Sequence, residues 1–129
     1  MEQRLRVGVE CNELAEVGAR EHGNVHRSDE LGAAALMRLF ERCDALRRPQ
    51  RFADVLLACE CDARGRLGRE HDAYPPARRL PPLLKAALAV DSAAVAAPAI
   101  ERGLAGPAIG ELVRAARTQA VADTLPSGL

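Results

Sequence analysis

The chain has 129 residues, a length typical of one compact domain that can bury a hydrophobic core. Hydrophobic residues make up 48% of the chain and charged residues 28%, a balance that argues against disorder throughout. The 18 basic and 18 acidic residues cancel, which excludes strong overall attraction to nucleic acid or to an anionic membrane but allows a local basic patch.

Arginine dominates the basic residues, because Lys85 is the only lysine among the 18. A guanidinium suits phosphate and carboxylate groups, although a genome of high GC content would produce the same bias. Aromatic residues make up only 2% of the chain, so little is present from which a base-stacking surface could be built. Any contact with RNA is therefore expected to be made through phosphates and shape.

The sequence shows neither a membrane span nor a signal peptide. No run of about 18 consecutive apolar residues occurs, and Met1 leads directly into polar and charged residues. The cysteines lie in helix-like surroundings, without the density of a disulfide scaffold. They are Cys11, Cys43, Cys59 and Cys61. We expect a cytoplasmic protein with no membrane partner and with reduced, buried thiols.

Strong helix formers dominate and β-branched residues are scattered singly, so the chain is predicted to be all-α. The expected architecture is a compact bundle of about five or six helices. The first main helix is predicted over residues 9–22, with residues 2–6 in an earlier helix. Gly23 and Asn24 are typical of a helix C-terminus, so this helix is expected to end there.

The next two helices are predicted from apolar residues at helical spacing. Ser28 is the expected N-cap of the second helix. The buried face of that helix is predicted to hold Leu36, Leu39, Phe40 and Cys43. Pro49 suits the first turn of the third helix, whose predicted buried face holds Phe52, Val55, Leu56 and Cys59. We expect these two helices to form an antiparallel pair.

Residues 65–82 are rich in glycine, proline and charge, so they are predicted to form a loop. Pro81 and Pro82 are then expected to open a helix, and Asp91 or Ser92 to cap a short alanine-rich helix ending near residue 103. Gly106 and the proline after it are predicted to start the last helix, which ends near residue 125.

Two pairs of residues invite comparison with metal sites. His71 and Asp72 resemble the metal-binding pair of HD-type phosphohydrolases, but they fall in the predicted loop, where a solvated pair is expected instead. Cys59 and Cys61 are about 200° apart on a helix, which prevents both thiolates from reaching one ion.

Glu21, His22 and His26 superficially resemble a zincin helix, in which two histidines four residues apart share one metal. The glutamate is misplaced, and the glycine and asparagine at residues 23–24 are expected to interrupt the helix. A capping or surface role is the alternative for the histidines. We therefore predict no metal site, with His22 as the nearest candidate ligand, and no catalytic residues.

The strongest feature is a locally basic middle region. Residues 38–79 carry 10 basic and 7 acidic groups. The third predicted helix has arginines at both of its ends, and these are Arg47, Arg48, Arg51, Arg64 and Arg66. The helix separates the two groups by about 18 Å, a plausible spacing for phosphates on a folded RNA. The alternative is a solvated face on which Glu60 and Asp62 pair with some of the arginines.

These same residues carry a resemblance to a known family. Residues 41–52 (ERCDALRRPQRF) and 59–66 (CECDARGR) closely resemble the C-terminal part of bacterial tRNA nucleotidyltransferases. These are the CCA-adding enzymes, in their multifunctional form with an HD phosphohydrolase domain. Tyr74 with Pro75, and residues 106–110 (GPAIG), fit in the same order. The resemblance covers residues 5–122.

The resemblance implies that residues 1–24 are a remnant of the last helix of the HD domain. Residues 25–129 would form an all-α C-terminal domain that binds tRNA or has a structural role. The nucleotidyltransferase and HD domains would lie upstream in the parent chain, which would use ATP, CTP and Mg²⁺, whereas this region would hold no cofactor. His22 matches a position at which some relatives carry a His-Asp pair, but here Gly23 follows it.

The resemblance implies a noncatalytic region that positions tRNA through the five arginines, and two other interpretations stay open. One is a structural or dimerisation module without RNA affinity, because a helix separated from the rest of the HD domain would expose apolar residues such as Leu14 and Val17. The other is a residual metal-dependent phosphohydrolase that uses His22, His26 or residues 71–72.

Overall fold

The computed structural model describes residues 2–65 and 73–126, with side chains from residue 14 onward. Within these residues the regular structure is entirely helical, so the all-α prediction is confirmed. The helices are α1 (Glu2–His26), the 3-10 helix η1 (Ser28–Glu30), α2 (Ala33–Arg42), α3 (Pro49–Arg64), α4 (Pro75–Leu88), α5 (Ser92–Glu101) and α6 (Pro107–Thr124).

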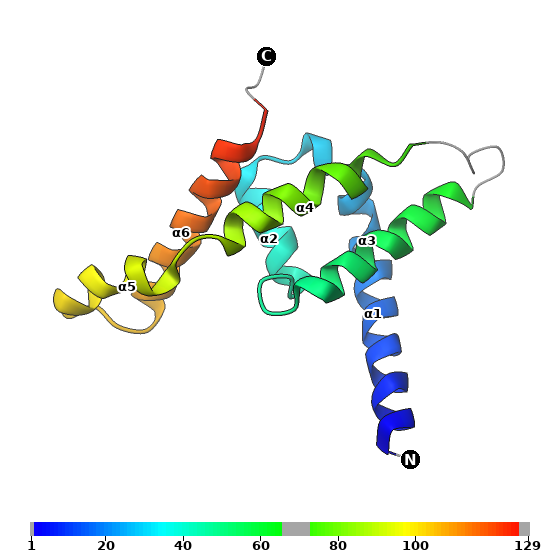
Figure 1. The fold of residues 1–129 in the computed structure, drawn as a ribbon, viewed down its shortest axis with the longest axis horizontal. Coiled ribbons are helices and arrows are strands. Elements are labelled where there is room, and N and C mark those ends of the chain that lie inside the picture. The colour runs from blue at the N-terminus through cyan, green and yellow to red at the C-terminus, as the bar shows by residue number, and fades with distance from the viewer. Residues whose placement is uncertain (1, 66–72, 127–129) are drawn as a thin grey trace.

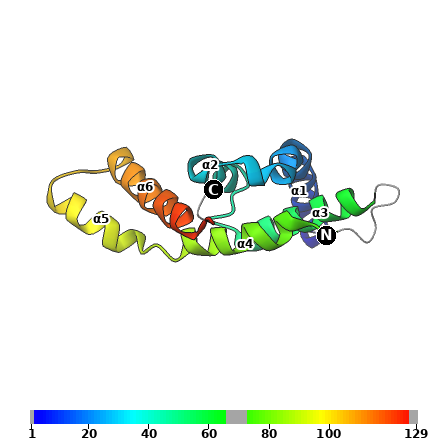
Figure 2. The ribbon, with the colours of Figure 1, turned by 90° about the horizontal axis from the view of Figure 1, so that it is seen from above.

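The helices surround one hydrophobic core near the middle of the molecule. α6 packs along α4, α2 and α5, while α3 packs along α1 and α4. The N-terminal half of α1 and the whole of α5 project from this central group in different directions (Figure 1). Seen from above, α4 and α5 follow one another along one side, and α6 and α2 lie on the other (Figure 2). The arrangement therefore leaves two ends of the molecule with few neighbours.

The apolar faces predicted for α2 and α3 are buried as expected. Leu36, Leu39, Phe40 and Cys43 are buried on the first, and Phe52, Val55, Leu56 and Cys59 on the second. The rings of Phe40 and Phe52 meet edge to face, with centroids 5.3 Å apart. The expected antiparallel pair was wrong, because α2 packs along α6 and α3 along α1 and α4. Asp44, with φ 55°, turns the chain between α2 and α3.

The first helix is longer than predicted. α1 is continuous from Glu2 to His26 and does not end at Gly23 and Asn24. A glycine that ends a helix adopts positive φ. Gly23 does not, and its carbonyl accepts a hydrogen bond from the Arg27 amide at 3.1 Å. The predicted N-cap of the second helix was also wrong. Ser28 begins η1, and Gly32 is the N-cap of α2.

The fourth helix begins earlier than predicted, at Pro75 instead of Pro81. Prolines fit the first turn of a helix, where the amide hydrogen has no helical partner, and Pro75 and Pro76 take these places. Pro81 and Pro82 lie inside the helix, each lacking the amide that would bond to the carbonyl four residues earlier. Those carbonyls belong to Ala77, which is half-buried, and to Arg78, which is exposed, so neither residue is closed off from water.

The predictions for the last two helices are confirmed. Asp91 caps α5, accepting a hydrogen bond at Oδ1 from the Ala94 amide at 3.1 Å. Gly106 adopts φ 56°, a left-handed conformation that suits glycine, directly before α6 starts at Pro107. α6 ends at Thr124, next to the predicted boundary.

One part of the described chain, Pro75–Glu101, is long and apolar enough to cross a membrane by length and composition, because an 18-residue window within it has a mean hydropathy of 1.6. A membrane span requires about 20 residues of continuous helix. The structure divides this segment into α4 and α5, of 14 and 10 residues, and Asp91 lies at the break between them.

The described cysteines differ in exposure, which corrects the expectation that all thiols are buried. Cys43 and Cys59 are buried free thiols, whereas Cys61 is exposed. Cys59 and Cys61 thus point to different sides of α3, as their spacing predicted. Burial raises the pKa of Cys43 to about 12 and that of Cys59 to about 11, and the nearby charge of Glu21 adds to the first shift.

We expect iodoacetamide at mildly alkaline pH to alkylate Cys61 well before Cys43 or Cys59, because the attacking species is the thiolate. Peptide mapping by mass spectrometry measures each site separately. The same reaction in denaturant is the control, in which the three thiols should react at similar rates. Equal rates in the native protein would contradict the burial of Cys43 and Cys59.

Candidate nucleic-acid interface

Helix α3 places the predicted arginines at its two ends. Arg47 and Arg48 lie in the turn before α3, Arg51 is in its first turn, and Arg64 is its last residue. With 16 residues, α3 is about 24 Å long, which is longer than the 18 Å predicted from the sequence. Arg66 lies outside the described residues. The structure therefore brings Arg47, Arg48 and Arg51 together and holds Arg64 well apart from them.

The two ends of α3 differ in their balance of charge. Arg47 Nε and Arg48 Nε lie 3.9 and 3.8 Å from the two carboxylate oxygens of Asp44. One carboxylate thus faces two guanidinium groups, and the Arg47 side chain is 80% exposed. Arg64 Nη1 instead forms a close ion pair with Glu60 Oε2, at 2.9 Å. The start of α3 therefore keeps a surplus positive charge, while the charge of Arg64 is balanced locally.

His26, one of the residues considered for a metal site, lies in a polar cluster between α1, α3 and the start of α4. The Tyr74 hydroxyl lies 2.6 Å from His26 Nδ1, and His26 Nε2 lies 3.7 Å from Asp62 Oδ2. Burial, together with the nearby groups Cys59 and Asp62, raises the pKa of Tyr74, so its phenol stays protonated at neutral pH. The cluster ties together three segments that are distant in the sequence.

The two histidines share one face of α1, which corrects the expectation that the helix breaks between them. The rings of His22 and His26 meet edge to face, with centroids 5.7 Å apart. His22 Nδ1 is engaged by the Ala19 carbonyl at 2.8 Å, and His26 Nδ1 is engaged by Tyr74. Among the side chains of residues 14–65 and 73–126, no three potential ligands gather closely enough to hold an ion. These residues do not fit a metal centre, and residues 71–72 lie outside the described residues.

Hollows on the described surface differ in chemistry. One, of about 500 Å³, is between α1 and α3, and Leu14, Gly18 and Cys59 are among its lining residues. Another, of about 410 Å³ between α3 and α4, is lined mostly by apolar residues such as Phe52 and Leu57. A third, of about 310 Å³, lies at the start of α4 and contains arginines that were predicted to lie in a loop.

No protein-family model and no solved structure matches the chain. The chain does match curated proteins, and three of these share the name "Multifunctional CCA protein". The protein from Paracidovorax citrulli is 68% identical over 94% of this chain and 29% of its own length. The protein from Acidovorax sp. strain JS42 is 60% identical over 95% of this chain and 29% of its own length. The protein from Verminephrobacter eiseniae is 61% identical over 97% of this chain and 30% of its own length.

The chain matches the C-terminal part of the multifunctional CCA proteins. The resemblance seen in residues 41–66 is thereby confirmed. The chain spans less than a third of the length of these relatives. The division of the chain at residue 24 stays a prediction, and helix α1 runs across that position to His26.

Proposed function

We propose that this region of a multifunctional CCA protein is noncatalytic and holds tRNA while the rest of such a protein adds and repairs the 3′ CCA end. The observation that carries the proposal is the surplus of exposed arginine charge at the start of α3, where Asp44 alone faces Arg47 and Arg48. The name of the relatives, which refers to CCA, supports tRNA as the polyanion that these arginines meet.

The placement of the aromatic residues supports contact through phosphates. Phe40 and Phe52 are buried in the core, and Tyr74 is engaged by His26. Among the described residues these are the aromatic rings that could have stacked on a base. Arginines bind phosphate through paired N–H donors without requiring a particular base. The region is therefore suited to hold an RNA by its backbone and shape.

The proposed cofactors ATP, CTP and Mg²⁺ are assigned to upstream nucleotidyltransferase and HD domains of the same parent chain. No chemical step is proposed for this region itself. The proposed place of action is the cytoplasm.

Binding of tRNA across a salt series tests this function. We expect wild-type affinity to fall as salt rises, because each neutralised phosphate releases counterions. Replacing Arg47 and Arg48 together by glutamine should reduce the slope of log affinity against log salt by about 0.7 to 0.9 for each lost contact. Adding Arg51→Gln should reduce it further if that residue also contacts phosphate.

The matched control for this experiment is Arg64→Gln, because Arg64 lies on the same helix but is paired with Glu60. Its effect on the slope should be smaller than that of the Arg47 and Arg48 change. Thermal unfolding shows whether each variant is folded. A folded wild-type chain without tRNA affinity, or an unchanged slope in the double variant, would contradict the proposed role of these arginines.

A second candidate function is a structural or dimerisation module without RNA affinity. The ion pair between Arg64 and Glu60 favours it, because pairing of arginines with nearby carboxylates is what that interpretation predicted. The exposed side chains of Ile100, Leu104 and Leu112 on and around α5 and α6 also suit a contact surface. Sedimentation that shows a concentration-dependent mass, together with no tRNA binding, would favour this function over the first.

A further inference from the structure

The hollow at the start of α4 is lined by two neighbouring arginines. Its walls are Ala73, Tyr74, Pro75, Arg78 and Arg79, and its volume is about 310 Å³. Pro75, Arg78 and Arg79 stand at helical positions i, i+3 and i+4, which places them on one face of α4. This face exists because α4 begins at Pro75 and not at Pro81. The side chains of Arg78 and Arg79 therefore both line one concave site.

The walls of this hollow are held by contacts on the side away from the solvent. Arg79 donates a hydrogen bond from Nη2 to Ser28 Oγ, and Ser28 is only 1% exposed. Tyr74 is held by its hydroxyl contact with His26 at 2.6 Å. Arg78 is exposed and has neither a hydrogen bond nor an ion pair within the described part of the chain. The Arg79 side chain is thus held in place before a ligand binds, and the Arg78 guanidinium is available to contact a ligand.

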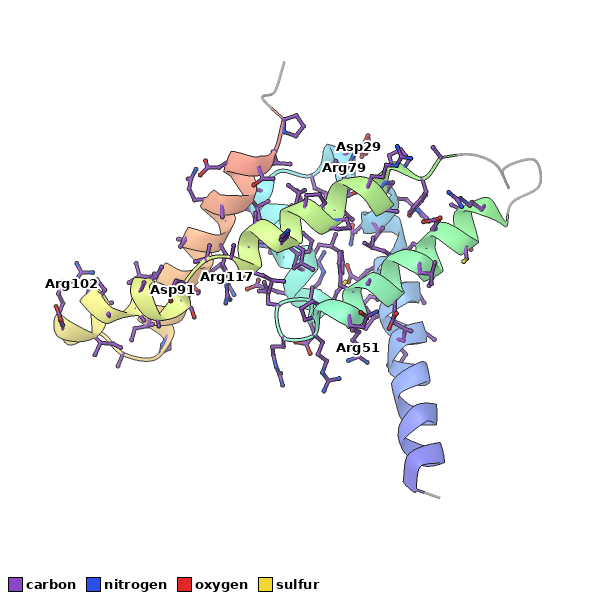
Figure 3. The ribbon with its side chains drawn as sticks, viewed as in Figure 1. Asp29, Arg51, Arg79, Asp91, Arg102 and Arg117 are labelled. Atoms are coloured by element: carbon purple, nitrogen blue, oxygen red, sulfur yellow. The ribbon has the colours of Figure 1, made fainter. Side chains whose placement is uncertain are left out.

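Two acidic residues of the described chain lie near this site without pairing with its arginines. Asp29 and Glu30 follow Ser28 in η1, which packs against α4. Figure 3 shows Asp29 and Arg79 in the same part of the structure, where η1 meets α4. Neither carboxylate forms an ion pair with Arg78 or Arg79 among the described residues. The site therefore keeps donor groups for an anion.

We propose that this hollow binds a backbone phosphate of RNA, with Arg78 and Arg79 donating to its oxygens. Paired N–H groups of a guanidinium match the oxygens of a phosphate. A polynucleotide is favoured over free phosphate, because an exposed pair of charges is screened by salt, whereas each contact with a polyanion also releases counterions. The inference rests on the proposed tRNA function and extends the RNA-binding surface from α3 to α4.

The test compares Arg78→Gln with Arg102→Gln in the tRNA salt series. Arg102 is the matched control, because it is also exposed without an ion pair among the described residues. It lies at the far end of α5, well away from Arg79 (Figure 3). Arg78→Gln should lower the slope by about 0.7 to 0.9 and the affinity at about 0.1 M salt by about five- to eightfold. Arg102→Gln should change neither quantity.

A chemical footprint gives a second readout that does not need a variant. Phenylglyoxal modifies free guanidinium groups, and bound tRNA should protect Arg78 while leaving Arg102 reactive. Inorganic phosphate at the same total phosphate concentration should protect Arg78 much less. Equal protection by inorganic phosphate would overturn the assignment to RNA and identify a site for free phosphate.

The outcomes separate this inference from the proposed function. If the wild-type chain binds tRNA but Arg78→Gln behaves like Arg102→Gln, the site on α4 is wrong and the role of α3 stands. If the folded wild-type chain does not bind tRNA, the proposed function fails and this site fails with it. The inference is supported if Arg78→Gln lowers both the tRNA affinity and the slope of log affinity against log salt, while Arg102→Gln changes neither.

Discussion

Replacing Phe52 by alanine is expected to lower the free energy of unfolding by about 4 kcal/mol. Phe52 is 1% exposed, and its ring meets Phe40 edge to face with centroids 5.3 Å apart. The change removes a large apolar side chain from the place where α2 and α3 meet, and rigid helices on either side prevent full closure of the cavity. A domain of this kind has a total stability of about 5 to 15 kcal/mol, so the loss is a large fraction of it.

Denaturant unfolding followed by circular dichroism measures this loss. The matched control is Leu57→Ala, because Leu57 lies on the same helix but is 60% exposed. That substitution should change the free energy of unfolding by no more than about 0.5 kcal/mol. Equal effects of the two substitutions would show that the core does not lie between Phe40 and Phe52.

Replacing Glu21 by alanine is expected to cost about 2 to 3 kcal/mol of stability. The Glu21 side chain is 3% exposed, and Arg42 Nε donates to both of its oxygens, at 3.0 and 3.1 Å. Asn24 and Arg20 supply two further hydrogen bonds, at 3.0 and 3.2 Å. This carboxylate joins α1 to the end of α2. The cost stays moderate because Arg20 and Arg42 are 57% and 43% exposed and can be hydrated after the change.

The same carboxylate predicts a dependence of stability on pH. Burial by itself would raise the pKa of Glu21, but the hydrogen bonds from Asn24 and Arg42, with the charge of Arg42, outweigh it and lower the pKa below 4.5. A lowered pKa contributes stability that is present above the unfolded-state value and is lost as pH falls through the folded-state value. The free energy of unfolding should therefore fall on acidification below about pH 5.

Urea unfolding of wild type and Glu21→Gln at several pH values checks both effects. The glutamine variant should be less stable at neutral pH and should lose less stability on acidification, because it has no carboxyl group to protonate at this position. Glu16→Gln is the control, since Glu16 is exposed on the same helix. A wild-type acid loss that persists unchanged in Glu21→Gln would assign the pH dependence to other groups.

Local patterns predicted most of the helices and their buried faces. The spacing of Phe52, Val55, Leu56 and Cys59 follows the helical repeat, and all four are buried. Asp91 was predicted as a cap because its short carboxylate can reach the amide three residues later, and it does so. The cluster of arginines around α3 was also visible, because residues 47, 48, 51 and 64 flank one helix in the sequence.

The candidate site on α4 was missed for a local reason. Pro81 and Pro82 favour a helix start when they are considered by themselves, so Arg78 and Arg79 were assigned to a loop. In the structure Leu80, Leu83, Leu84 and Ala87 are buried together, which favours a single helix in spite of the two internal prolines. The run of Tyr74 and two prolines was the signal that could have placed the helix start correctly.

By itself, the sequence determined the helical class, the apolar face of each central helix and the similarity to part of the multifunctional CCA proteins. These properties depend on residue type and on spacings of three or four residues. Only the tertiary structure decided which faces meet and which charges are paired. Arg42 donates a hydrogen bond to Glu21, which lies 21 residues earlier in the chain. Arg79 donates one to Ser28, which lies 51 residues earlier. Such partners are set by which packing of the whole chain buries the most apolar surface while satisfying its buried polar groups.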